Sequence, residues 1–128
     1  MTNSGDEYID QIKEKDFTIA DTTEHMVGEF DHLRTFLKQR DWSGAKLHIN
    51  RLVALSHHLK RKVTGIGATR LWLMLKSMRT YLKWALKHNR SIDQQMKTLD
   101  FIENWSEEVA RKASLAAKEG KEVELAFP

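Results

Sequence analysis

The sequence predicts an all-α protein: an antiparallel up-down four-helix bundle with a short N-terminal helix and an extended C-terminal tail. Three observations support this fold class. The chain has 128 residues, the size of one domain. It has no cysteine, and its one proline is the last residue, so no proline interrupts a helix within the chain. Apolar residues recur three or four positions apart in four long segments that short breaks separate, which is typical of helical bundles.

The chain is expected to divide into three parts. Residues 1–21 would form a leader with a short helix over 6–15, and its apolar side would carry Tyr8, Ile9 and Ile12. Residues 22–118 would form the bundle. Residues 119–128 would be a flexible tail, because the alternating apolar residues of VELAFP are too few for a sheet.

The first long helix is expected over residues 22–40, with Thr22 or Thr23 capping its first amide groups. The break that follows should be Asp41-Trp42-Ser43-Gly44. The expected inward-facing residues are Met26, Val27, Phe30, Leu33 and Leu37.

The remaining helices are expected over 44–64, 68–88 and 92–118. Gly65 and Gly67 should end the first of these, since each glycine costs about 1 kcal/mol inside a helix. Ser91 is a plausible cap for the last helix, and Gly120 should end it. The expected inward-facing residues are Ala45, Ile49, Leu52, Ser56, Leu59, Val63, Leu71, Leu75, Met78, Leu82, Ala85, Leu86, Ile92, Met96, Leu99, Ile102, Val109 and Ala113.

The charge of the chain is strongly segregated. Residues 42–92 contain eleven Lys or Arg and no acid, whereas 1–41 carry ten acids and five bases and 93–128 carry eight acids and five bases. The net charge of +3 therefore conceals one basic stretch between two acidic ones. A basic surface of this kind favours a polyanionic partner.

A basic stripe is predicted on the third long helix. At ~100° per residue, its cations and one tryptophan fall on a flank between about 80° and 160° from Leu71. The members of this stripe are Trp72, Lys76, Arg79, Lys83, Lys87 and, if the helix extends that far, Arg90. Like charges one turn apart repel, so the stripe needs a compensating partner. Phosphates are one such partner, with Trp72 stacking on a base. Acids elsewhere in the fold (Glu29, Asp31, Glu103, Glu107, Glu108) are the alternative.

The second long helix ends in more cations. Lys60, Arg61 and Lys62 precede the turn, and Arg70 follows it, so a helical hairpin would gather them with the stripe. The two glycines of the turn could expose backbone N–H groups to a phosphate. A plain helix-to-helix turn is the simpler interpretation of the same residues.

Residues 56–71, SHHLKRKVTGIGATRL, resemble the motif of histidine-containing phosphotransfer (HPt) domains, H-x-L-K-G-S-A followed by I/L-G-A-x-x-L. The resemblance extends to the end of the first long helix, LRTFLKQRDW. The matching positions are His57, Leu59, Lys60, Ile66, Gly67, Ala68 and Leu71. HPt domains are four-helix bundles whose exposed histidine takes a phosphoryl group from a receiver-domain aspartate. The resemblance implies that His57 is the acceptor and that Lys60 stabilises it.

The sequence departs from the HPt pattern at the docking surface. Arg61 and Lys62 stand where the family has small residues that let the receiver domain approach. The spacing between Trp42 and His57 is also about two helical turns longer than usual. These departures weigh against phosphotransfer on steric grounds.

Other chemistries find little support in the sequence. Glu29 and His32 form a single E-x-x-H, whereas di-iron bundles need two copies, so no metal or other cofactor is expected. Adjacent His57 and His58 diverge by ~100° on a helix and cannot share an ion. Without a nucleophile motif or paired carboxylates, we expect no enzymatic activity. The absence of a long apolar run indicates no membrane span, and a cytoplasmic protein is expected.

The preferred interpretation is a non-catalytic helical bundle that binds RNA or DNA through its basic hairpin. Contacts to phosphates would make binding weakly sequence-specific. Small basic helical subunits of CRISPR effector complexes look similar in outline, and by analogy the protein could serve as an accessory subunit of a nucleoprotein complex. The alternatives are an HPt-like phosphorelay module and an interaction bundle that meets an acidic protein. The expected nucleic-acid-binding residues are Lys60, Arg61, Lys62, Arg70, Trp72, Lys76, Arg79, Lys83, Lys87 and Arg90.

Overall fold

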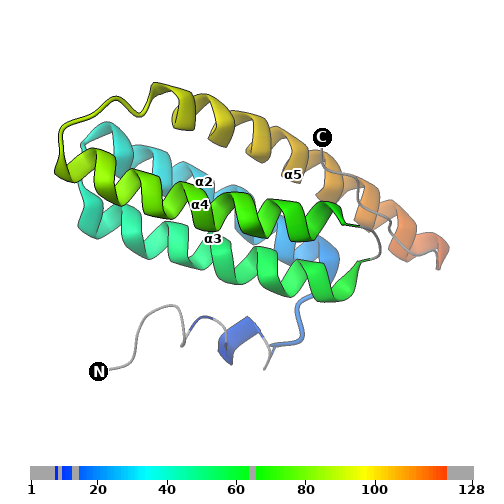
Figure 1. Ribbon diagram of the computed structural model, residues 1–128. Coiled ribbons are helices and arrows are strands. Elements are labelled where there is room, and N and C mark those ends of the chain that lie inside the picture. Colours follow the sequence, from blue (N-terminus) through cyan, green and yellow to red (C-terminus); the bar gives the residue numbers. More distant parts are fainter. Residues whose placement is uncertain (1–7, 9, 13–14, 64–65, 121–128) are drawn as a thin grey trace.

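The computed structural model describes residues 8, 10–12, 15–63 and 66–120, and over them the chain is all-helical, as predicted (Figure 1). No strand occurs among these residues. Successive long helices run in opposite directions (Figure 1). Helix α2 packs against both α3 and α5, and α3 packs against α4. The four helices are α2 (Ile19–Lys38), α3 (Trp42–Lys62), α4 (Gly67–Lys87) and α5 (Asp93–Glu119).

The core consists of the apolar stripes that the periodicity predicted. Nearly every expected inward position is buried, and Phe30 and the leucines of α2 have no exposed surface. The exceptions are Val27, Val63, Leu86 and Met96, which are partly buried because they lie at the edge of a stripe or near a helix end. Helical spacing therefore identified most of the core, although it missed Phe17, Leu55 and Ala68, which are also buried.

Helix α2 begins earlier than expected. Thr18 is its N-cap: the Thr18 hydroxyl accepts from the Asp21 N–H at 3.1 Å, and the Asp21 carboxylate accepts from the Thr18 N–H at 3.1 Å. The prediction that Thr22 or Thr23 caps the helix was wrong. Both lie buried within the first turns, where their hydroxyls donate to the carbonyls of Thr18 and Ile19. A reciprocal capping box satisfies two backbone donors, which explains why the earlier start is preferred.

The other helix ends also shift by one or two residues. Helix α3 begins at Trp42, because the Asp41 carboxylate accepts from the Gly44 N–H at 3.4 Å and caps the first turn. Helix α4 ends at Lys87, and Asn89 then adopts a left-handed backbone with φ 53°. Arg90 consequently lies beyond the helix, so the condition for including it in the stripe of α4 is not met.

The last helix starts and ends close to the predicted positions. The Ser91 hydroxyl accepts from the Asp93 N–H at 3.3 Å, close to the capping role expected for it. At the far end, Gly120 adopts φ 69°, the left-handed conformation that commonly follows a helix. The predicted glycine turn at residue 65 and the tail over 121–128 fall outside the described residues.

The segment before α2 docks against α3. Residues 8 and 10–12 are helical, in agreement with the short helix expected there, and Ile12 and Phe17 are buried with the core. His58 of α3 is itself buried, and its Nε2–H donates to the Phe17 carbonyl at 3.0 Å. The Arg51 guanidinium lies over the Tyr8 ring at 5.2 Å. Burial raises the pKa of Tyr8 to about 12, and the charge of Glu29 adds to the effect while Arg51 opposes it.

A substitution at Gly44 can test the packing of α2 on α3. A Cβ at this position would overlap the Phe36 ring, which stacks on His48, so Gly44→Ala should destabilise the protein by about 1–3 kcal/mol. Gly28 is the matched control on α2, because a Cβ there meets nothing within 4 Å. Gly28→Ala should stabilise by about 0.5–1 kcal/mol through helix propensity. Urea unfolding followed by circular dichroism measures both changes, and an unaffected Gly44→Ala variant would contradict this packing.

Candidate nucleic-acid interface

Two neighbouring helix edges form a continuous polar surface, which we call the basic seam. Positions three or four apart on α3 lie alongside positions with the same spacing on α4. The seam consists of Lys46, Asn50, His57 and Lys60 of α3 and Trp72, Lys76, Arg79 and Lys83 of α4. At 1.5 Å per residue it extends about 21 Å along the helices.

One end of the seam widens into a depression of about 390 Å³. Its walls include Trp42, Lys46 and Asn50 from α3 and Arg79 and Lys83 from α4. The Arg79 Nη1–H donates to the Asn50 Oδ1 at 3.1 Å, so the guanidinium is held against α3. A fixed guanidinium between two lysines is a suitable arrangement for binding phosphate oxygens.

At the other end of the seam, three polar side chains contact Trp72. The Lys60 and Lys76 ammonium groups lie 4.1 Å and 4.3 Å from the centroid of its ring. The His57 ring meets the indole edge-on at 5.4 Å. Cation–π attraction offsets part of the repulsion between the two lysines. A base could stack on Trp72 only by displacing a lysine, so Trp72 acts first as a support for the cations around it.

The acids of the fold neutralise other cations. Glu29 contacts His48 at 2.5 Å and Arg51 at 3.5 Å. Asp31 and Glu103 both contact Arg34 of α2. On α5, Glu108 contacts Arg111 and Lys112.

The seam cations thus lack acidic partners in the described part of the chain. No carboxylate of residues 8, 10–12, 15–63 or 66–120 forms an ion pair with Lys46, Lys60, Lys76, Arg79 or Lys83. The alternative in which acids of α2 and α5 compensate the basic stripe therefore finds no support in these contacts. The charge remains available to an external partner.

Three cations expected in the hairpin surface lie away from the seam. Arg61 and Lys62 border a separate depression with Asp16 and His58, on the side of α3 that faces the N-terminal segment. Lys62 contacts Asp16 at 2.8 Å, and this hydrogen bond, with the charge of Lys62, holds the pKa of the Asp16 carboxyl below its usual value. Arg70 is exposed at the start of α4, roughly 160° around that helix from Trp72.

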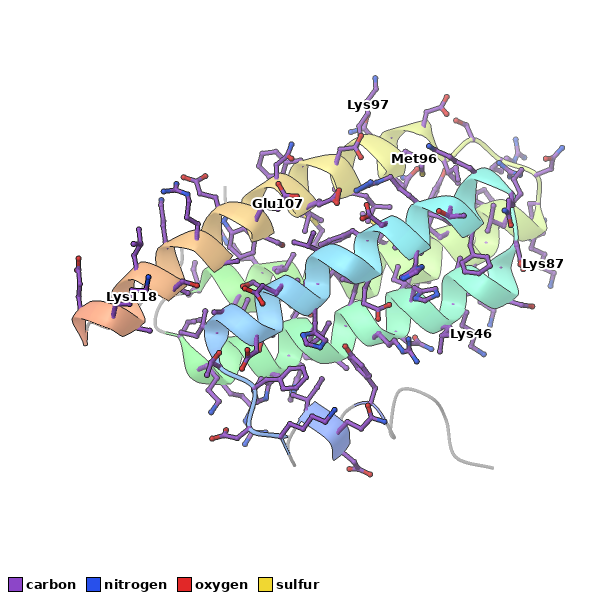
Figure 2. The ribbon with its side chains drawn as sticks, turned by 180° about the vertical axis from the view of Figure 1, so that it is seen from behind. Lys46, Lys87, Met96, Lys97, Glu107 and Lys118 are labelled. Atoms are coloured by element: carbon purple, nitrogen blue, oxygen red, sulfur yellow. The ribbon has the colours of Figure 1, made fainter. Side chains whose placement is uncertain are left out.

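Lys87 and Arg90 extend the basic surface past the seam. Lys87 is exposed in the last turn of α4 and lies at the same end of the molecule as Lys46 (Figure 2). The Arg90 carbonyl accepts from the Arg40 guanidinium at 2.8 Å, which fixes the connection after α4. Its own guanidinium lies 5.8 Å from the Trp84 ring centroid.

Lys46, Asn50 and Trp84 were not among the residues expected at the site. The signal for the first two was available, since residues 46, 50, 53, 57 and 60 repeat at spacings of four and three. These residues, Lys60 among them, lie on one edge of α3. The sequence does not show that this edge faces α4, so the sequence alone could not assign the row to the seam. Trp84 falls outside the cationic flank of α4, so a search for that flank overlooks it.

Of the residues that match the HPt motif, His57 and Lys60 line the seam, whereas Leu59, Ala68 and Leu71 are buried in the core. His57 is partly buried and packs against Trp72, and Lys60 also lies over that ring. Arg61, which replaces a small residue of the HPt motif, is exposed one position further along. His57 and Lys60 therefore line the seam beside Trp72.

Comparisons with known proteins give no indication of function. The chain matches no family model, no curated protein and no solved structure. Among the described helices, none combines the length and the apolar character that a bilayer crossing requires. The part of the chain that the structure describes holds no group of three or more His, Cys, Asp or Glu suited to a metal ion.

The free energy of unfolding distinguishes the seam cations from structural ones. Lys83→Gln removes no ion pair formed by the described residues and relieves repulsion, so it should leave stability unchanged or raise it by a few tenths of a kcal/mol. Arg34→Gln removes contacts with Asp31, Asp100 and Glu103, and should cost about 1.5–3 kcal/mol. Urea denaturation compares the two, and a similar loss from both would make Lys83 a structural residue.

Proposed function

We propose that the protein binds nucleic acid, RNA or DNA, along the basic seam and chiefly through the phosphate backbone. One observation carries the proposal: five cations line a single seam, and no described carboxylate pairs with any of them. The repulsion among these cations lowers stability unless a polyanion compensates it. Release of counterions from a phosphate backbone supplies the driving force for such binding.

The dimensions of the seam suit a nucleic-acid strand. Consecutive nucleotides of a B-form strand rise about 3.4 Å along the helix axis, so a seam of about 21 Å covers roughly six nucleotide steps of such a helix. Lys46, Arg79 and Lys83 would contact phosphates at the depression, and Lys60 and Lys76 would do so at the end near Trp72. Lysine and arginine contacts to phosphates carry no base information, and binding should depend little on sequence.

The proposed architecture is an antiparallel up-down four-helix bundle that presents the seam on one side. The packing of α2 between α3 and α5, and of α3 against α4, supports this arrangement. A rigid, non-catalytic surface of this kind suits an accessory subunit of a nucleoprotein complex in the cytoplasm. An acidic protein is the rival partner for the same cations.

The phosphotransfer alternative receives less support from the geometry. An HPt domain needs an accessible histidine beside small residues, whereas His57 packs on Trp72 and its neighbour Arg61 is large and exposed. Detection of an acid-labile phosphate on His57 after incubation with phosphorylated receiver domains would reverse this preference. We therefore retain nucleic-acid binding as the proposed function.

Salt dependence tests the proposal directly. Binding of a labelled oligonucleotide should weaken steeply as salt rises. Lys46→Ala and Lys83→Ala should each lower the slope of log K against log salt by about 0.7–0.9, because each removes one phosphate contact. Fluorescence anisotropy at several salt concentrations measures the slopes.

Lys97→Ala is the control for this titration. Lys97 is an exposed lysine on α5, away from Lys46 and Lys87 (Figure 2), and its loss should leave the slope unchanged. Absence of binding at low salt would overturn the proposal. Tighter binding to polyglutamate than to the oligonucleotide would favour the acidic protein partner instead.

A further inference from the structure

An exposed tryptophan lies in the last turn of α4, about 100° around the helix from the seam residue Lys83. This residue, Trp84, leaves 46% of its surface exposed. Its ring is close to Tyr81, whose centroid lies at 5.8 Å, to His88 at 5.3 Å, and to the Arg90 guanidinium at 5.8 Å. We call these four residues the Trp84 cluster.

The cluster is held in place on both sides of the helix end. The Tyr81 hydroxyl donates to the Ser91 carbonyl at 3.0 Å, and Arg40 donates to the Arg90 carbonyl. These bonds tie the connection after α4 to the helix itself. The indole is therefore presented by a fixed support, with low entropic cost for a ligand that stacks on it.

The charges around Trp84 distinguish it from an ordinary exposed apolar residue. Lys87 and Thr80 lie one turn away along the helix, and Arg90 lies beside the ring. Asp93 is the nearest acid along the chain, and it borders a different depression with Arg40. A flat aromatic surface next to uncompensated cations fits a base with its adjoining phosphate.

Phe101 provides the contrast within the same protein. It is exposed to a similar extent, 49%, but its setting on α5 has charges of both signs. Lys97 lies one turn before it, while Asp100 and Glu103 lie near it along the chain and contact Arg34. A surface of mixed charge attracts phosphates less than one that carries cations alone. Exposure of an aromatic ring alone therefore does not make a base platform, whereas the Trp84 cluster combines the ring with positive charge.

We propose that the preferred ligand is single-stranded nucleic acid, one base of which stacks on Trp84 while its phosphates reach Lys87 and the seam. The inference rests on the proposed function and specifies its ligand. In a duplex the bases stack on one another and leave no face for the indole, whereas an unpaired base presents both faces. Every base has such a face, so the stacking adds affinity without adding sequence preference.

The test compares a labelled single-stranded oligonucleotide with its duplex at one low salt concentration, using the full chain. The unmodified protein should bind the single strand more tightly. Trp84→Ala should weaken single-strand binding roughly 5- to 100-fold, the usual range for loss of one stacked base, and change duplex binding little. Trp84→Phe should retain part of the lost affinity, because it keeps an aromatic face. Phe101→Ala, the matched control, should leave both affinities unchanged.

Intrinsic fluorescence provides a second readout that a purely structural role would not alter. Single-strand binding should quench tryptophan emission, and the quenching should fall in Trp84→Phe. If Trp84→Ala and Trp84→Phe bind the single strand as tightly as the unmodified protein while Lys83→Ala weakens it, this inference is wrong and the proposed function stands. If the unmodified protein binds neither ligand, both fail.

Discussion

Burial of one apolar stripe on α3 and one on α4 determines where the positive charge of the protein lies. Because Ile49 and Leu52 face the core on α3, the row from Lys46 to Lys60 falls at the edge shared with α4. Leu75 and Leu82 place Lys76 and Lys83 at the same edge from the other side. The core thus brings two rows of like charge together, and the seam follows from packing that is itself stabilising.

The fold limits the cost of this arrangement locally and does not neutralise it. Trp72 accepts two lysines on its ring, and Asn50 takes a hydrogen bond from Arg79, so three of the cations have a defined neutral neighbour. The described acids that form ion pairs do so elsewhere, on α2, on α5 and at Asp16. Positive charge is therefore retained along one surface. Removing it would favour stability, whereas the proposed function requires it.

Periodicity allowed the helices and the core to be predicted, but it could not predict how helix faces pair. The flank of α4 that holds Lys76, Arg79 and Lys83 was found because a helix fixes the angle between its own residues. The α3 half was predicted poorly: Arg61 and Lys62 follow Lys60 directly, yet successive residues diverge by ~100° and these two turn toward Asp16 and His58. Sequence proximity was mistaken there for spatial proximity.

The ends of the helices set further limits on prediction. Arg90 continues the spacing of the stripe, but the left-handed backbone at Asn89 removes it from the helix and places it beside Trp84. Likewise, Thr22 and Thr23 have the side chains of caps, and the capping box at Thr18 displaces them. Local hydrogen bonds of this kind move a boundary by a turn or less, and one turn is enough to reassign a side chain to another surface.

Backbone amide chemical shifts, recorded while a short single-stranded oligonucleotide is added, test the central claim most directly. The shifts that change most should belong to residues 46–60 of α3 and 72–90, on and beyond α4, with little change on the outer faces of α2 and α5. Changes concentrated around Asp16, His58 and Lys62, or along α5, with an unaffected seam would contradict it.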